Sequence, residues 1–215
     1  MSKRKDGSMK NSSFNRQKFL SQFRIDNKDT VTAGLVHGNN IKHVSKYDLG
    51  KFIKNTDSLI TNEKGVFLTI TTADCLPILL YDPKKEAIGL IHAGWRGLVL
   101  NIVGHTVKRM GKDFGSKAKN IIAGIGPGIS VCHFEVKKDI EKKFKKYQKA
   151  IEKRNGKILI DLKKIAFLQL LEGGVKRENI EINPECTFHK EIYFSFRRDR
   201  VLPLKAQLVV MGLTK

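Results

Sequence analysis

The residues with the clearest chemical potential are one cysteine and two histidines, which stand where apolar segments give way to loops. Cys75 lies in the phrase TTADCLPILLYD (71–82), His92 opens HAGWRG (92–97), and His37 lies in VHGNN. Open α/β sheets place ligands at such strand ends. Two imidazoles and one thiolate also form a known catalytic zinc set, whose fourth position stays open to water or substrate. The residue types therefore indicate a metal site if the three side chains meet, although packing alone also explains each of them separately.

Three arginines are candidates for binding an anion. Arg96 follows Trp95 inside a glycine turn, and its planar guanidinium suits an oxyanion or a phosphate. Arg197 and Arg198 stand together in FSFRRD and either bind anions or face solvent. The glycine-rich phrase GIGPGIS matches neither the dinucleotide-binding nor the Walker A pattern, so the sequence does not predict a Rossmann or nucleoside-triphosphate site.

The remaining histidines and cysteines carry no functional pattern of their own. Cys132 and His133 are adjacent, and packing is the simplest explanation for such a pair. His43, His105 and His189 stand in contexts that packing or solvent exposure explains. The three cysteines lie far apart without a CxxC pair, which argues against a zinc finger or a disulfide scaffold and favours a reducing compartment.

Buried strands and amphipathic helices must position these residues. Helices are predicted over 97–111, ended by Gly111, and over 161–174, with Asp161 as N-cap and a glycine pair as terminator. A basic segment over 136–154 has one apolar stripe, formed by Ile140, Phe144, Tyr147 and Ile151, and predicts a further helix. Strands are predicted from β-branched, apolar runs at 65–73, 76–82, 87–94, 120–126 and 157–162, with closing strands at 193–196 and 206–213. This mixture predicts an α/β (α+β) layered sandwich with a mixed central sheet.

Size and charge limit the remaining possibilities. A chain of 215 residues suits one domain, and we expect a disordered basic tail over 1–18 followed by a single domain over 19–215. The formal net charge is +20, which favours anionic partners. However, the lysines are spread along the chain without a nucleic-acid-binding signature, so nucleic acid is not the expected partner. No apolar run of about 18 residues predicts a membrane span, and a cytoplasmic protein is expected.

The motifs also occur together in a recognisable order. VHGNNI, TDSLIT, TTADCLPILLYD, IGLIHAGWRGL, GIGPGISVCHFEV, LIDL, CT and YFSFRRD follow one another within residues 31–213. This series resembles the YfiH/DUF152 family, also called the laccase-domain or multicopper polyphenol oxidase-like family. The resemblance implies a layered α/β domain similar to that of a cytotoxic-factor cysteine hydrolase.

The resemblance implies a zinc-dependent purine nucleoside enzyme, with copper as an alternative metal. Such an enzyme phosphorolyses adenosine, inosine and methylthioadenosine and deaminates adenosine, so its partners are a purine nucleoside and phosphate, and the chain is expected to be a monomer or a homodimer. The family's metal ligands fall on His37, Cys75 and His92. Arg96, Arg197 and Arg198 are then the candidate phosphate-binding residues.

Asp74, next to Cys75, is the remaining catalytic candidate. Its carboxylate could orient a ligand histidine, cap the loop, or act as a general base.

Three alternatives stay open at the level of sequence. Cys75 could be the nucleophile of a cysteine hydrolase, activated by His92 or His37. A copper-dependent polyphenol oxidase is the second alternative, because copper binds well to nitrogen and sulfur donors. The third is a degenerate, non-enzymatic member that binds RNA or other anions through its positive charge, which would show as a steep salt dependence of binding.

Overall fold

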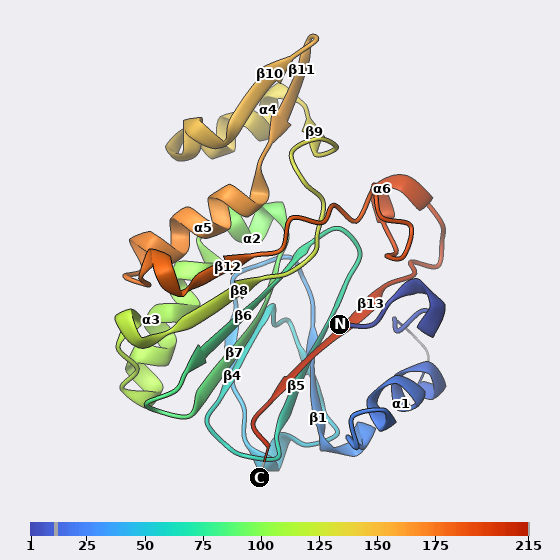
Figure 1. Ribbon diagram of the computed structural model, residues 1–215, viewed down its shortest axis with the longest axis vertical. Helices are drawn as coiled ribbons and strands as arrows, with labels where there is room; N and C mark the ends of the chain where they lie inside the picture. The colour runs from blue at the N-terminus through green and yellow to red at the C-terminus, as the bar shows by residue number, and fades with distance from the viewer. Residues whose placement is uncertain (11–12, 215) are drawn as a thin grey trace.

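Two mixed sheets and a layer of helices form the body of the protein in the computed structural model, which describes residues 1–10 and 13–214. A four-stranded sheet has the order β13-β5-β1-β3, and a six-stranded sheet has the order β12-β8-β6-β7-β4-β2. Helices α2, α3 and α5 cover the outer face of the six-stranded sheet (Figure 1). The predicted layered α/β fold is thereby confirmed.

The strands and helices have the following bounds. The strands are β1 Thr30–Gly34, β2 Ile41–His43, β3 Phe52–Lys54, β4 Ser58–Thr61, β5 Phe67–Thr72, β6 Leu76–Asp82, β7 Ala87–Ala93, β8 Ile122–Ile125, β9 Glu135–Val136, β10 Ile151–Arg154, β11 Lys157–Ile160, β12 Ile180–Ile182 and β13 Gln207–Gly212. The helices are α1 Ser13–Ser21, α2 Trp95–Val99, α3 Ile102–Phe114, α4 Lys138–Glu141, α5 Leu162–Glu172 and α6 Phe196–Asp199. None of the helices within the described residues combines the length and apolar character of a membrane span.

Strand β7 shows why the central strands are apolar on both faces. All seven of its residues are buried, and alternate side chains point to opposite faces of a strand. Ile91 packs into the core shared with the helices, whereas Ile88 and Leu90 pack into the core between the two sheets. Each such side chain contributes about 1.5–3 kcal/mol by leaving water, so the central strands are the rigid base of the molecule.

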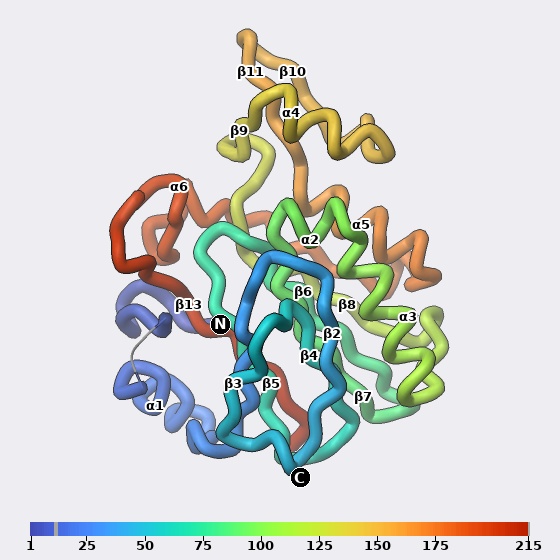
Figure 2. Tube along the Cα trace, turned by 180° about the vertical axis from the view of Figure 1, so that it is seen from behind, coloured from blue at the N-terminus to red at the C-terminus, as the bar shows by residue number. Residues whose placement is uncertain are grey.

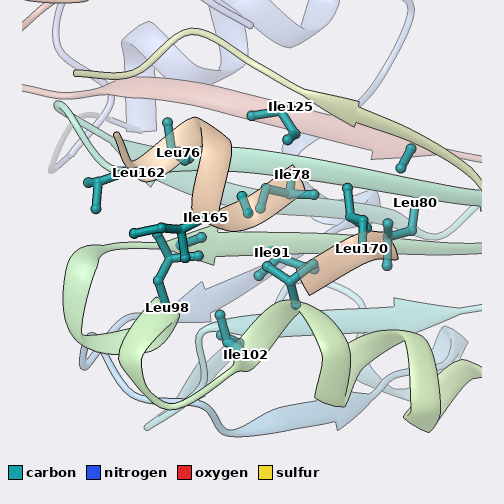
Figure 3. Packing of buried hydrophobic residues seen from close by; sticks show 14 of the residues in the cluster. Leu76, Ile78, Leu80, Ile91, Leu98, Ile102, Ile125, Leu162, Ile165 and Leu170 are labelled. Carbon is teal, nitrogen blue, oxygen red and sulfur yellow. The ribbon is translucent and has the colours of Figure 1, made fainter. Parts of the chain in front are cut away.

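The helical side of this core is built from leucine and isoleucine. The side chains of β6, β7 and β8 meet those of α2, α3 and α5 in Figure 3, which labels Leu76, Ile78, Leu80, Ile91, Leu98, Ile102, Ile125, Leu162, Ile165 and Leu170. Helix α5 begins as predicted, because the Asp161 side chain accepts a hydrogen bond from the N–H of Lys164. It ends at the predicted glycine pair, Gly173 and Gly174.

Three predicted elements differ from the structure. The helix predicted over 97–111 is two helices, because Asn101 takes a left-handed conformation (φ 55°) between them. The second helix continues past Gly111 and ends at Gly115. Residues 193–196 are not a strand: the Ser195 side chain accepts from the N–H of Arg198 and begins α6 instead.

The basic segment 136–154 is also not one helix. It starts as α4 and continues as 3-10 turns, with non-helical backbone angles at Phe144 and Tyr147, and Ile151 begins strand β10. The predicted apolar stripe is real nevertheless, since Phe144 and Tyr147 are buried in the main core. The β10–β11 hairpin with α4 projects from one end of the molecule (Figure 1).

The N-terminal residues are folded against the sheet, contrary to the disorder expected for 1–18. The backbone N–H of Ser2 donates to the carbonyl of Leu208 (2.8 Å), and Met9 and Phe19 are buried beside Leu208 in a small separate core. Figure 2 shows this segment running beside β13. Its few apolar residues cover the edge of β13, which composition alone did not reveal. Within the expected tail, residues 11 and 12 lie outside the described residues.

Candidate functional site

The three predicted metal ligands meet at one end of the six-stranded sheet. His92 lies at the end of β7, and Cys75 immediately precedes β6, which pairs with β7 so that Leu76 stands opposite Ala93. His37 follows β1 in a left-handed conformation (φ 60°). One potential ligand atom from each of His37, Cys75 and His92 lies within 4.8 Å of those of the other two. The three side chains, called the reactive cluster below, are therefore close enough to share one metal ion.

Gly94 leaves the room that the reactive cluster needs. A Cβ at this position would lie 3.0 Å from the Sγ of Cys75 and 3.2 Å from the Cδ2 of His37. Any side chain would therefore displace these two residues. The requirement is steric, because the φ of Gly94 is an ordinary −80°. This explains the glycine at the start of the turn.

A buried carboxylate, Asp57, holds both histidines in place. Its Oδ1 accepts hydrogen bonds from the Nδ1 of His92 (2.9 Å) and from the backbone N–H of His37 (2.9 Å). Its Oδ2 accepts from the N–H of Gly38 (2.8 Å) and, at 3.2 Å, from that of Val36. Because Nδ1 of His92 is engaged, Nε2 is left for the cluster. Carboxylates that orient ligand histidines in this way are typical of metal sites.

Sequence reasoning missed this role of Asp57. The residue stands in the phrase TDSLIT, directly before the fully buried strand β4. The available signal was a charged residue at the edge of a buried strand, since such charges need a partner.

The electrostatics of the reactive cluster favour a thiolate. Burial raises the pKa of the Cys75 thiol, but the charge of His92 and hydrogen bonds from both histidines outweigh burial and lower the pKa to about 6. Burial in turn lowers the pKa of His92, whereas the thiolate and Asp57 raise it to about 9. The two groups titrate as one coupled pair. The thiolate is the form that binds metal ions, so this donor set fits a divalent metal.

Asp74 caps a loop and does not orient a ligand histidine. Its two carboxylate oxygens accept hydrogen bonds from the hydroxyl of Thr187 and from the backbone N–H of Arg197, both at 2.7 Å. Its carbonyl accepts from the N–H of Ile129 (2.8 Å). Among the three roles predicted for Asp74, the structure therefore supports loop capping, and Asp57 takes the role of orienting a histidine. Its use as a general base stays a prediction.

A cavity of about 370 Å³ opens at the reactive cluster. Its size lies within the range of small-molecule sites. Its lining combines His37 and Cys75 of the cluster with aromatic and aliphatic side chains and two arginines. The lining residues are His37, Ala73, Asp74, Cys75, Trp95, Arg96, Ile129, Phe134, Phe196, Arg197 and Leu204.

Two of the three predicted arginines reach this cavity. Arg96 is exposed, and its guanidinium stacks over the ring of Trp95 at 4.3 Å from the centroid. Arg197 lies over Phe134, and its Nη1 donates to the carbonyls of His133 (3.3 Å) and Glu135 (3.1 Å). Both leave N–H groups available for an anion, because a guanidinium has five.

The third, Arg198, does not line the cavity. Its guanidinium donates to the carbonyls of Thr187, Phe188 and Tyr193 and pairs with Asp199. The turn of α6 sends this side chain into the protein while its neighbour Arg197 faces the cavity. Arg198 therefore joins α6 to the segment 187–193 and stabilises the local fold.

Comparison with known proteins agrees with this architecture. The family described as multi-copper polyphenol oxidoreductase laccase matches residues 2–211. A Bacteroides thetaiotaomicron protein named purine nucleoside phosphorylase is 40% identical over 170 residues, which cover 76% of this chain and 62% of that protein. A Bacillus subtilis protein named purine nucleoside phosphorylase YlmD is 33% identical over 199 residues, 86% of this chain and 72% of its own.

Solved structures share the fold over nearly the whole chain. The crystal structure of YlmD from Geobacillus stearothermophilus superimposes with a TM-score of 0.89 at 30% identity, over 94% of this chain and 79% of that one. A Bacillus licheniformis protein described as YfiH gives a TM-score of 0.88 at 30% identity, over 93% and 80%.

Proposed function

This chain belongs to the multi-copper polyphenol oxidoreductase laccase family, as its motifs indicated, and we propose that within this family it is a purine nucleoside phosphorylase whose metal is zinc. The observation that carries the proposal is the reactive cluster, which opens into a cavity with an apolar wall and two arginines. The names of the relatives from Bacteroides thetaiotaomicron and Bacillus subtilis support the same activity.

The reaction needs two binding regions, and the cavity offers both. In phosphorolysis, a phosphate oxygen forms a bond to the anomeric carbon of the ribose while the bond from that carbon to the purine nitrogen breaks. The purine leaves with the bonding electrons and takes up a proton. The apolar wall of Trp95, Phe134 and Phe196 suits the flat base. Arg96 and Arg197 suit the phosphate, because guanidinium groups bind its oxygens in pairs.

His37, Cys75 and His92 would hold the zinc ion. When bound, such an ion polarises an oxygen ligand and lowers the pKa of bound water. The protein's own residues fix the geometry: Asp57 holds both histidines, and Asp74 ties the backbone of Arg197 to the cavity wall. Positioning of this kind lowers a barrier because the reactants need not be ordered during the reaction.

The proposed substrates are adenosine, inosine and methylthioadenosine. The apolar wall, which includes Ile129 and Leu204, also suits a 5′-methylthio group in place of a hydroxyl. We include adenosine deamination in the proposal, in which water adds to C6 of the purine and ammonia leaves. Both reactions place the same base in the same cavity.

Product analysis tests the activity directly. Inosine and phosphate are incubated with the wild type and with Cys75→Ala, and hypoxanthine and ribose 1-phosphate are measured. We expect both products from the wild type only, and dependence on added phosphate. His105→Ala is the matched control, because His105 is exposed and lies outside the reactive cluster. Equal turnover by Cys75→Ala and the wild type removes Cys75 from the mechanism.

One observation favours a second candidate, a cysteine hydrolase. Cys75 contacts His92, and His92 donates a hydrogen bond to Asp57, which is the spatial arrangement of a catalytic triad with a thiol pKa of about 6. Hydrolase activity of the metal-free protein that iodoacetamide abolishes would favour this candidate. Stoichiometric zinc that disappears in His37→Ala would favour the phosphorylase.

The metal itself needs identification, because the family description refers to copper. The donor set of the reactive cluster binds copper as well as zinc. Elemental analysis of the purified chain, with phenol oxidation measured beside phosphorolysis, separates the two. If the chain contains copper and oxidises phenols, and Cys75→Ala loses this activity, the protein is a copper-dependent oxidase and not a zinc-dependent phosphorylase.

A further inference from the structure

A second group of potential metal ligands lies beside the cavity. Cys132 and His133 follow β8 on one loop, and Cys186 and His189 follow β12 on another. One ligand atom from each of the four lies within 4.8 Å of all the others. The two loops are joined by backbone contacts, since Gly128 bridges to Cys186. The four residues are called the loop cluster below, and none of them belongs to the reactive cluster.

The distances within the loop cluster match those around a single metal ion. The Sγ of Cys132 lies 3.3 Å from the Nδ1 of His133 and 3.7 Å from the Nδ1 of His189. Zinc bonds of about 2.3 Å to sulfur and about 2.0–2.1 Å to nitrogen put such atoms roughly 3.5 Å apart in a tetrahedron. The spacing therefore corresponds to neighbouring corners of a tetrahedral site.

We propose that Cys132, His133, Cys186 and His189 form a second metal site, a closed two-cysteine, two-histidine site for a zinc-type divalent cation. Four protein ligands leave no position for water or substrate, which is the pattern of structural sites. Cys186 is buried, Cys132 and His133 are half-buried, and His189 is exposed. A cation can thus enter from the side of His189.

Packing alone accounts for only part of this arrangement. The ring of His133 stacks on Phe188 (3.9 Å between centroids, 16° between planes) and meets the ring of His189 edge-on at 4.2 Å. These contacts explain the position of the imidazoles but not the convergence of both thiols on them. The nearby ammonium of Lys163 does not fill the centre, because it donates to the carbonyls of Asn183 and Glu185.

The proposed ion would fix one wall of the cavity. Phe134 lines the cavity immediately after His133, and Arg197 donates to the carbonyl of His133. On the other loop, Thr187 follows Cys186 and donates to the carboxylate of Asp74. A metal bridging the two loops would therefore hold Phe134 and Arg197 in position. Its role is to support the cavity and not to react.

Counting metal ions in the 215-residue chain, purified under reducing conditions, tests the proposal. We expect two ions per chain in the wild type and one in either Cys186→Ser or His189→Ala. Cys75→Ala also keeps one ion, having lost the other site, and His105→Ala keeps both. His189 is exposed, so its variant remains informative if the buried Cys186→Ser does not fold. Because each cluster is removed by its own variant, failure of this proposal is distinguishable from failure of the proposed function.

Cobalt provides a second measurement that is independent of activity. In the Cys75→Ala background, added Co²⁺ should give the visible bands of a tetrahedral site and a thiolate charge-transfer band. The further change His189→Ala should abolish the tetrahedral bands. The proposal is overturned if the wild type binds only the ion that Cys75→Ala removes. It is also overturned if the reduced chain binds no second ion and the untreated chain is lighter by two hydrogens, which would mean a Cys132–Cys186 disulfide.

Discussion

The reactive cluster and the loop cluster use the same two residue types but are supported in different ways. His92 stands in β7 and Cys75 directly before its partner strand β6, and the carboxylate of Asp57 binds the ring of His92 and the backbone N–H of His37. In contrast, the four residues of the loop cluster stand on two loops that their own contacts hold together. A site with three protein ligands leaves a position open for a reactant, whereas a site with four leaves none. Ligand number and support therefore distinguish the proposed reactive site from the proposed structural site.

Asp57→Asn should have the largest effect, a loss of metal affinity at the reactive cluster. The amide keeps the shape of the carboxylate, but it loses the charge that faces His92 and the backbone N–H groups of the His37 loop. Loss of a carboxylate that orients a metal ligand typically lowers metal affinity or activity by about 10–100-fold. We expect this loss at the reactive cluster only, measured by competition with a chelator. Asp82→Asn is the control, because Asp82 is equally buried but lies at the far end of β6; an equal loss in both variants would contradict the account.

Metal removal should separate the two clusters by stability. A chelator should lower the melting temperature of Cys75→Ala, because the loop cluster still holds an ion that supports two loops. If the ion adds about 2 kcal/mol to the free energy of unfolding, its removal lowers the melting temperature by about 4–8 °C for a chain of this size. The variant Cys75→Ala/His189→Ala should melt at the same temperature with and without chelator. Calorimetry measures both, and a shift that survives in the double variant would assign the stabilising ion to another place.

Arg96→Ala should affect substrate binding and leave both metal ions in place. Its guanidinium is exposed beside the reactive cluster, and a charge-assisted hydrogen bond contributes about 1.5–3 kcal/mol. We therefore expect the KM for phosphate to rise about tenfold or more, with a smaller change in kcat. Arg109→Ala, which removes an arginine of α3 that does not line the cavity, should leave both constants unchanged. An unchanged KM for phosphate in Arg96→Ala would leave Arg197 as the anion-binding residue of the cavity.

Asp199→Asn should have the smallest effect, a modest loss of stability. It tests how much the ion pair of Asp199 with Arg198 stabilises the fold without a metal ion. Partial burial raises the pKa of Asp199, but hydrogen bonds from Arg198 and Arg4 outweigh burial and lower the pKa to about 2. A carboxylate whose pKa is lower in the folded protein stabilises the fold at any pH above its pKa in the unfolded chain. This contribution is lost as the pH falls from about 4 to about 2. We expect Asp199→Asn to cost about 1–2 kcal/mol at pH 7 and progressively less in that acid range. Urea unfolding at several pH values measures the difference, and a cost that does not change with pH would mean that packing is responsible.

The sequence was sufficient where function depends on local position. Cys75 and His92 could be placed at strand ends because the apolar runs on either side define β6 and β7. The layered fold followed from the same runs. Asp161 was correctly predicted as an N-cap because the signal is contained within a few residues.

Sequence reasoning failed where the role of a residue depends on distant partners. Asp57 reaches His92 only because β4 pairs with β7. The loop cluster forms only because β12 lies beside β8, so Cys132 and Cys186 carried no joint pattern. The opposite directions of Arg197 and Arg198 depend on α6, which begins at Ser195 in a segment whose composition indicated a strand.

Zinc titration of the metal-depleted chain tests whether His37, Cys75 and His92 hold the metal that turnover requires. Hypoxanthine release from inosine and phosphate is followed as zinc is added to the wild type and to Cys75→Ala. We expect no turnover without metal, a rise in the wild type that stops once the reactive cluster is filled, and no rise in Cys75→Ala. Full turnover by the metal-free wild type, or an equal rise in Cys75→Ala, would contradict the claim that His37, Cys75 and His92 hold the functional metal.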